Sequence, residues 1–122
     1  MRIAIPDWHG QVSPVFDVAG RLLVVDLDEG REIARKVIVL ANLTPTRRVL
    51  RLKALGVETL VCGAISRPLE QLVTRLGIRI ISLVSGPLEK VERFVALGQP
   101  IPETYLLPGC RQPRIRPAAQ KQ

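Results

Sequence analysis

The sequence predicts a single α/β domain built on a mixed five-stranded sheet, with the element order β-β-β-α-β-α-β-α and helices packed on the sheet. Three observations lead to this fold class. Apolar, β-branched runs fill the first forty residues, helical periodicity alternates with short apolar runs after them, and glycine or proline marks most boundaries. With 122 residues, 47% of them hydrophobic, the chain can bury one core and is too short for two.

The first forty residues predict three strands. Arg2–Ile5 is a short apolar strand, Arg21–Leu27 is a second, and Glu32–Leu40 is a third that follows a turn at Gly30. The first two strands are joined by the loop Asp7–Gly20, which is long for a compact domain. Loops of this length often carry function.

The second half predicts three helices that alternate with two strands. The strands are the apolar runs Thr59–Cys62 and Ile78–Leu83. Capping residues and prolines begin the helices and glycines end them, between Thr44 and Gly56, Ser66 and Gly77, and Ser85 and Gly98. Right-handed crossovers would place these two strands parallel to the first strand. The resulting arrangement resembles the ribonuclease-H-like fold.

Residues 98–122 form a proline-rich basic tail, which we expect to be irregular or disordered beside a folded domain of residues 1–97. The net charge is +7, and the tail holds a disproportionate share of it. An anionic partner fits this charge, and a solvated tail that maintains solubility fits it equally. Because only 3% of the residues are aromatic and no recognition motif accompanies the charge, nucleic acid is not an expected partner.

The compartment follows from what the chain lacks. No apolar run approaches the roughly 18 residues that span a bilayer, and Pro6 interrupts the first apolar run before a signal-peptide core could form. We therefore expect a cytoplasmic protein with no membrane partner. In that reducing compartment Cys62 and Cys110 should be free thiols or metal ligands.

The loops after the first, third, fourth and fifth strands should meet at one end of the sheet, because these strands point the same way. Ligands favour this end, and three helix N-termini, which attract anions, open there. At the helical repeat Arg47, Arg48 and Arg51 point within about 100° of one another around the helix axis, so they share one face. Arg47 and Arg48 lie near one of these N-termini. Cations are unfavourable at that end unless an anion binds, so replacing Arg47 and Arg48 by glutamine should leave the free protein at least as stable. A solvated basic face is the alternative.

The candidate cofactor-binding residues therefore come from these loops and helix N-termini. They are His9, Asn42, Thr44, Arg47, Arg48, Gly63, Ser66, Ser85 and Gly86.

Three residues are candidate metal ligands. His9 is the only histidine and follows the first strand in a loop, where it suits a ligand or a proton carrier, although an exposed histidine without a role is the alternative. Cys62 ends an apolar strand, a place where a cysteine is more often part of the core, and Cys110 lies in the tail with no packing role. Imidazole and thiolate both suit iron–sulfur centres.

Enzymatic motifs are missing from the sequence. It contains no zinc-binding, phosphate-loop or serine-hydrolase pattern. Ribonuclease-H-type catalysis needs a cluster of carboxylates around two metal ions, whereas the predicted strand interiors offer chiefly Asp26. We therefore expect a protein that is not an enzyme.

The chain resembles the dinitrogenase iron-molybdenum cofactor biosynthesis family of small accessory and carrier proteins. The resemblance covers about residues 1–97, and Leu107–Cys110 is similar to a Pro-Gly-Cys tail in a branch of the family. The segments that carry it are Arg2–Pro6, Val12–Asp17, Arg21–Asp26, Gly56–Ser66 and Gly77–Ile78. Many members have Ser-x-His-Phe-Gly in the first loop, where this chain has Val15 and Asp17 at the histidine and glycine positions. His9, in the same loop, is the candidate to replace that histidine.

The resemblance implies a non-catalytic accessory or carrier domain that binds an anionic iron–sulfur or iron-molybdenum-type metallocofactor or its precursor. The partners that it implies are proteins that assemble or receive the cofactor. The alternative is a protein-interaction or regulatory module that has kept the fold and lost the cofactor site.

Overall fold

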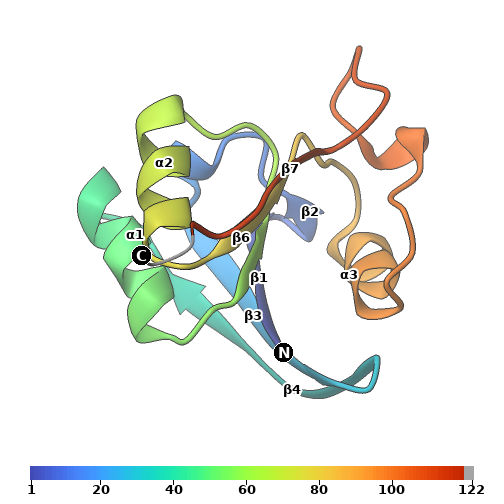
Figure 1. Cartoon of the computed structure of the whole chain (residues 1–122), viewed down its shortest axis with the longest axis horizontal. Helices are drawn as coiled ribbons and strands as arrows, with labels where there is room; N and C mark the ends of the chain where they lie inside the picture. The colour runs from blue at the N-terminus through green and yellow to red at the C-terminus, as the bar shows by residue number, and fades with distance from the viewer. Residues whose placement is uncertain (120–122) are drawn as a thin grey trace.

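The strand β1 (Arg2–Trp8) lies in the middle of a seven-stranded mixed sheet in the computed structural model, which describes residues 1–119 (Figure 1). The strand order is β4-β3-β1-β5-β6-β7, and the short β2 pairs with the end of β1. The other strands are β2 (Gln11–Val12), β3 (Arg21–Asp28), β4 (Arg31–Val39), β5 (Thr59–Val61), β6 (Arg79–Ser82) and β7 (Arg114–Arg116).

The strand directions agree with the prediction. β5 and β6 run parallel to β1, whereas β3 runs antiparallel to both β1 and β4. The predicted number of five strands is wrong, because β2 and β7 join the five that were expected. Both additions are short, and pairing with a neighbouring strand, which a local pattern does not reveal, defines each of them. The similarity to the ribonuclease-H-like fold stays a prediction.

Three helices cover the sheet in two layers. The helices α1 (Pro45–Ala54) and α2 (Arg67–Arg75) pack on one face, and α3 (Leu88–Ala96) packs on the other (Figure 1). The predicted helices are therefore confirmed, each beginning close to its proline. Within residues 1–119, no helix has the length and apolarity needed to cross a membrane.

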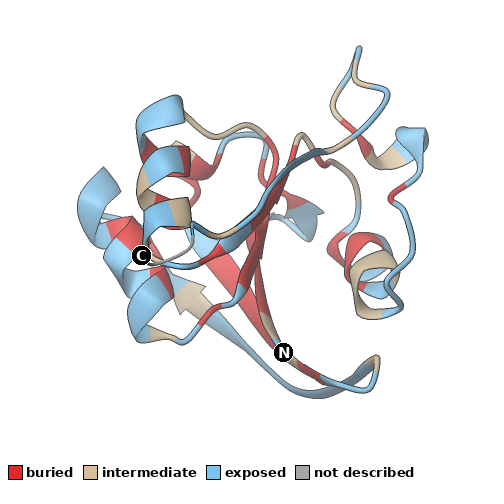
Figure 2. Cartoon of the chain, viewed as in Figure 1, coloured by how far each residue is buried: buried red, intermediate tan, exposed pale blue. Residues whose placement is uncertain are grey.

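The sheet separates two apolar cores, which appear as buried strands and inward helix faces in Figure 2. Phe16, Leu22 and Leu60 pack with α1 and α2 on one side. Ile5, Val25 and other side chains of the opposite face pack with α3 and the tail. Both faces of β1 and β3 are buried for this reason.

The tail is more ordered than the sequence predicts. It forms a short 3-10 helix at Glu103–Tyr105 and then β7, which pairs antiparallel with β6. Arg114 and Arg116 also lie 3.2 and 3.6 Å from the carboxylate of Glu70 on α2. The expectation of an irregular tail is thus wrong for β7, since strand pairing and ion pairs order it; residues 120–122 of that predicted tail lie outside the described residues.

Candidate functional site

The end of β1 carries a cleft of about 380 Å³, at the carboxyl end of the parallel strands. Two chain segments form it: the end of β1 with the turn that follows, and the first residues of β3. Its lining residues are Asp7, Trp8, His9, Gly10, Gly20 and Arg21. This is the end at which the sequence predicts a site, and His9 is the predicted site residue that lines the cleft.

His9 and Gly10 form the two-residue turn of the hairpin between β1 and β2. Trp8 pairs with Gln11 across the turn, and both central residues have positive φ, 54° at His9 and 82° at Gly10. The Asp7 carboxylate accepts a hydrogen bond of 2.8 Å from the Gly10 amide and so closes the turn. The turn therefore places the exposed His9 beside the cleft.

The Trp8 side chain is 57% exposed, and its ring meets the His9 ring edge to face at 4.9 Å between centroids. A large aromatic side chain that is this exposed often marks a contact surface. Trp8 lies within the predicted loop Asp7–Gly20 and is not among the candidate site residues that the sequence predicts. The signal that was available is its position next to the only histidine.

The other wall of the cleft leads to the turn after β4. The Gly20 carbonyl oxygen accepts hydrogen bonds from the amides of Leu40 and Ala41, at 2.8 and 3.2 Å. Asn42 follows in an exposed turn with φ of 70°. Arg21, which adds a cation to this wall, was missed because only its pairing with Asp7 places it there.

Of the two arginines that the sequence places near the start of α1, only Arg47 is exposed. Its amide donates to the Thr44 hydroxyl at 3.2 Å, so Thr44 is confirmed as the N-cap of α1. The shared arginine face is wrong for Arg48, which is buried and donates to the carbonyl oxygens of Ala19 and Leu40. Its guanidinium lies 5.9 Å above the Phe16 ring.

Arg48 is therefore a structural residue. Burial lowers its pKa, and the nearby Asp17 carboxylate acts in the opposite direction. The sequence contained a signal for this burial, because Arg48 lies four residues before the buried Leu52 and next to the buried Val49, on the apolar stripe of α1.

The N-terminus of α2 already holds a carboxylate of the chain. Asp17 accepts a hydrogen bond of 2.9 Å from the amide of Ser66, the residue before the helix. Gly63 lies nearby for a packing reason, since a Cβ there would meet the Pro14 carbonyl oxygen at 2.5 Å. Ser66 and Gly63 therefore join the first loop to the loop after β5.

The loop after β6 contacts both the hairpin turn and the tail. The amide of Val12 donates to the Gly86 carbonyl oxygen, and the amide of Leu88 donates to that of Gly10. Ser85 uses its hydroxyl to donate to a tail carbonyl oxygen at 2.8 Å. A Cβ at Gly86, whose φ is 110°, would lie 2.7 Å from the Tyr105 ring. Ser85 and Gly86 thus support the turn that carries His9.

The two thiols lie in different surroundings. Cys62 is fully buried in the core under α1 and α2, where burial foremost, with the charges of Glu70 and Asp17, raises the pKa of its thiol far above the ordinary value. Cys110 is half-buried against the core under α3. Within residues 1–119, no three side chains of His, Cys, Asp or Glu come together as a metal site, so His9, Cys62 and Cys110 form no such shared centre.

The sequence profile of the family described as dinitrogenase iron-molybdenum cofactor matches residues 1–97. None of the curated proteins compared with the chain matches it. The crystal structure of PH0822 superposes with a TM-score of 0.77 at 22% identity, covering 81% of this chain and 91% of that one.

Two further solved structures have the same fold. The crystal structure of a candidate dinitrogenase from Methanocaldococcus jannaschii gives a TM-score of 0.70 at 19% identity, covering 81% of this chain and 90% of that chain. The apo form of the orange protein from Desulfovibrio gigas gives 0.64 at 23% identity, covering 93% and 95%. These likenesses concern the fold, and the profile match assigns the family: the chain belongs to the dinitrogenase iron-molybdenum cofactor family.

Proposed function

We propose that this protein is a non-catalytic carrier that binds an anionic iron–sulfur or iron-molybdenum-type cluster, or its precursor, in the cleft beside His9. In this proposal it receives the cluster from assembly proteins and passes it to a recipient protein in the cytoplasm. Family membership supports a link to cofactor biosynthesis or binding. The observation that carries the choice of site is the placement of His9 in a strained, exposed turn at the lip of the cleft.

The hairpin turn itself favours asparagine over histidine at this position. Two-residue turns with positive φ at both positions are formed best by Asn-Gly, and a non-glycine residue in this left-handed region costs about 1–2 kcal/mol. His9 has a positive φ of 54°, and among the described residues its side chain makes no hydrogen bond that would stabilise this conformation. A strained residue that the fold does not require supports a role in binding.

The side chains around the cleft suit an assembled cluster better than a bare metal ion. A bare ion needs several ligands, and the described residues offer no group of three. An intact anionic cluster can instead bind through one imidazole and through charge. His9 supplies the imidazole and Arg21 a guanidinium, both from the cleft lining, while Arg47 on α1 is a further exposed cation.

The carboxylates support carriage rather than hydrolysis. Asp26, the interior strand carboxylate, is held in an ion pair with Arg2 at 2.5 Å, at the end of β3 away from the cleft. This guanidinium also lowers the pKa of Asp26. Asp7, the acidic residue of the cleft, accepts a hydrogen bond from the turn. We therefore propose that the protein catalyses no phosphodiester cleavage.

The test is anaerobic purification followed by measurement of iron, molybdenum and sulfide per chain, then loading with extracted iron-molybdenum cofactor. His9→Asn and Arg21→Gln should each weaken binding, with Arg31→Gln as the control, because Arg31 is an exposed arginine at the far end of the β3–β4 hairpin. Binding that is equal in all four proteins would remove the cleft from the proposal. A complete lack of cluster binding, with capture of an assembly protein, would favour the interaction module instead.

A further inference from the structure

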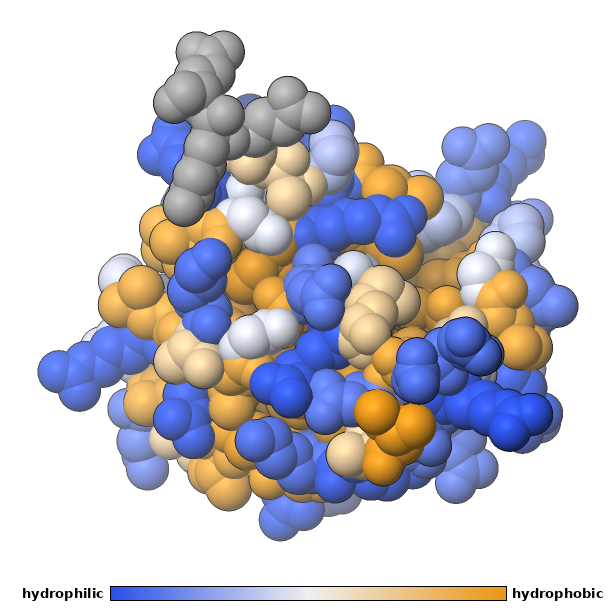
Figure 3. All heavy atoms as spheres, turned by 60° about the horizontal axis from the view of Figure 1, so that its bottom comes forward, coloured by the Kyte–Doolittle hydropathy of each residue, from blue (hydrophilic) through white to orange (hydrophobic). Residues whose placement is uncertain are grey.

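A second and larger cleft, of about 650 Å³, lies at the amino end of the parallel strands. Met1, Thr59 and Arg79, which begin or precede β1, β5 and β6, line one side of it. Figure 3 brings this end of the molecule forward and shows apolar residues set among hydrophilic ones. The volume is within the range of roughly 300–1,000 Å³ that is typical of small-molecule sites.

The tail forms much of this cleft. More than half of its lining residues lie between Gly98 and Ile115, beyond the segment that the family profile matches. One wall therefore depends on how the tail is held against the sheet. The pairing of β7 with β6 and the contacts of Arg114 and Arg116 with Glu70 hold it there.

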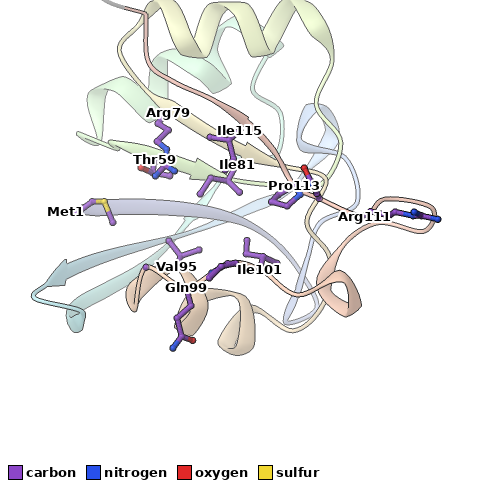
Figure 4. A pocket seen from close by; sticks show the side chains of 13 residues that line it. Met1, Thr59, Arg79, Ile81, Val95, Gln99, Ile101, Arg111, Pro113 and Ile115 are labelled. Atoms are coloured by element: carbon purple, nitrogen blue, oxygen red, sulfur yellow. The ribbon is translucent and has the colours of Figure 1, made fainter.

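The interior of the cleft is apolar. Figure 4 shows Ile81 and Ile115 on the sheet side facing Val95 and Ile101 on the side of α3 and the tail. Such opposed aliphatic side chains suit a ligand with an aliphatic body, because each buried methylene group contributes about 0.8 kcal/mol.

The charge of the lining is of one sign. Its two charged side chains are Arg79 and Arg111, and within residues 1–119 neither Asp nor Glu lines the cleft. Arg111 points away from the cleft in Figure 4, whereas Arg79 stands beside Thr59 at the mouth. The mouth near β5 and β6 is therefore the place for an anionic head group.

We propose that this cleft binds a single-chain aliphatic anion such as a medium-chain fatty acid. The chain lies between Ile81 and Ile101, and the carboxylate lies at the mouth near Arg79. This site is at the opposite end of the sheet from His9 and does not depend on the cluster-carrier proposal.

The primary test is titration of the full isotope-labelled protein with dodecanoate below its micelle concentration, followed by amide resonances. Saturable shifts should concentrate at Ile81, Ile101 and Ile115, with none at His9. Dodecanol should bind more weakly, because it has the chain without the charge. Shifts that are absent, that lie around His9, or that appear only with anionic phospholipid vesicles would overturn the proposal.

Matched variants test the head group and the wall. Arg79→Gln should weaken dodecanoate about two- to fivefold, the range of a partly exposed ion pair, and should not change dodecanol binding. Arg75→Gln, on an exposed arginine at the end of α2, is the control. Ile115→Asp should abolish binding of dodecanoate, with circular dichroism used to check the fold. Equal affinities in the Arg79 and Arg75 variants would refute the assignment of the carboxylate.

Discussion

Replacement of Arg48 by methionine should strongly destabilise the protein, whereas replacement of its neighbour Arg47 should leave the stability unchanged. Arg48 comes from α1 and reaches the loop before β3, where its guanidinium donates to the carbonyl oxygen of Ala19. A second nitrogen donates to the Leu40 oxygen at 3.4 Å. One side chain thus joins the helix, the first loop and the end of β4.

The expected loss follows from these contacts. The Ala19 carbonyl would lose its partner, which costs about 1–3 kcal/mol for a buried group. The cation–π contact with Phe16 adds about 0.5–2 kcal/mol. Leu40 contributes less, because its oxygen also accepts from the Leu43 amide. Removal of the buried Nε, which has no partner among the described groups, offsets part of the total, so we expect a loss of about 2–4 kcal/mol.

The assay is urea unfolding followed by far-ultraviolet circular dichroism, on wild type, Arg48→Met and Arg47→Gln. The unfolding midpoint should fall clearly for Arg48→Met at an unchanged m-value. Arg47→Gln should change stability by less than about 0.5 kcal/mol, because the side chain is exposed. If both variants unfold at the wild-type midpoint, then Arg48 does not hold the loop, and the sequence-based prediction that Arg47 and Arg48 share an exposed face is supported instead.

Three further predictions concern single groups. His9→Asn should raise the free energy of unfolding by about 0.5–1 kcal/mol, because asparagine tolerates positive φ better; a destabilised variant in urea unfolding would show that the turn needs histidine. In the native protein Cys110 should react with a thiol reagent well before Cys62, whose burial raises its pKa, and equal rates by mass spectrometry would contradict this. Burial and Glu32 raise the pKa of Glu92, so its contribution to stability is present below the ordinary pKa of 4.5 and is lost as the pH rises through the folded value. In thermal melts across this pH range, Glu92→Gln should lose less stability with rising pH than wild type does, and an equal loss in both proteins would refute this role of Glu92.

The fold was largely predictable because its main elements have strong local signals. Proline and glycine mark α1 and α2, and apolar runs mark β1, β3 and β6. β2 and β7 were not predictable, because two or three residues carry no periodicity. β7 is an exposed Arg-Ile-Arg segment, and only its pairing with β6 and the two ion pairs to Glu70 make it a strand.

The end of the sheet that carries the site was predictable, whereas several of the residues and contacts that form the site were not. Strand direction alone brings His9 to the carboxyl end of the sheet, because β1 is parallel to β5 and β6. The contact of Asp17 with Ser66 joins residues far apart in the chain, and no local pattern announces it. Arg21 enters the cleft for a similar reason, through its register opposite Asp7.

The helix N-termini offer less to a ligand than the sequence suggests, because the chain places its own acceptors there. The Thr44 hydroxyl accepts from α1, the Asp17 carboxylate from the residue before α2, and the Gly10 carbonyl oxygen from the first amide of α3. Asp17 is therefore a structural anion of the chain itself at the start of α2. If the proposed cluster binds, it competes with that carboxylate at α2, whereas the cleft offers the imidazole of His9 and the guanidinium of Arg21 beside one carboxylate, Asp7, which already accepts from the Gly10 amide. Selection of the cluster should therefore depend on the hairpin turn rather than on the helix dipoles.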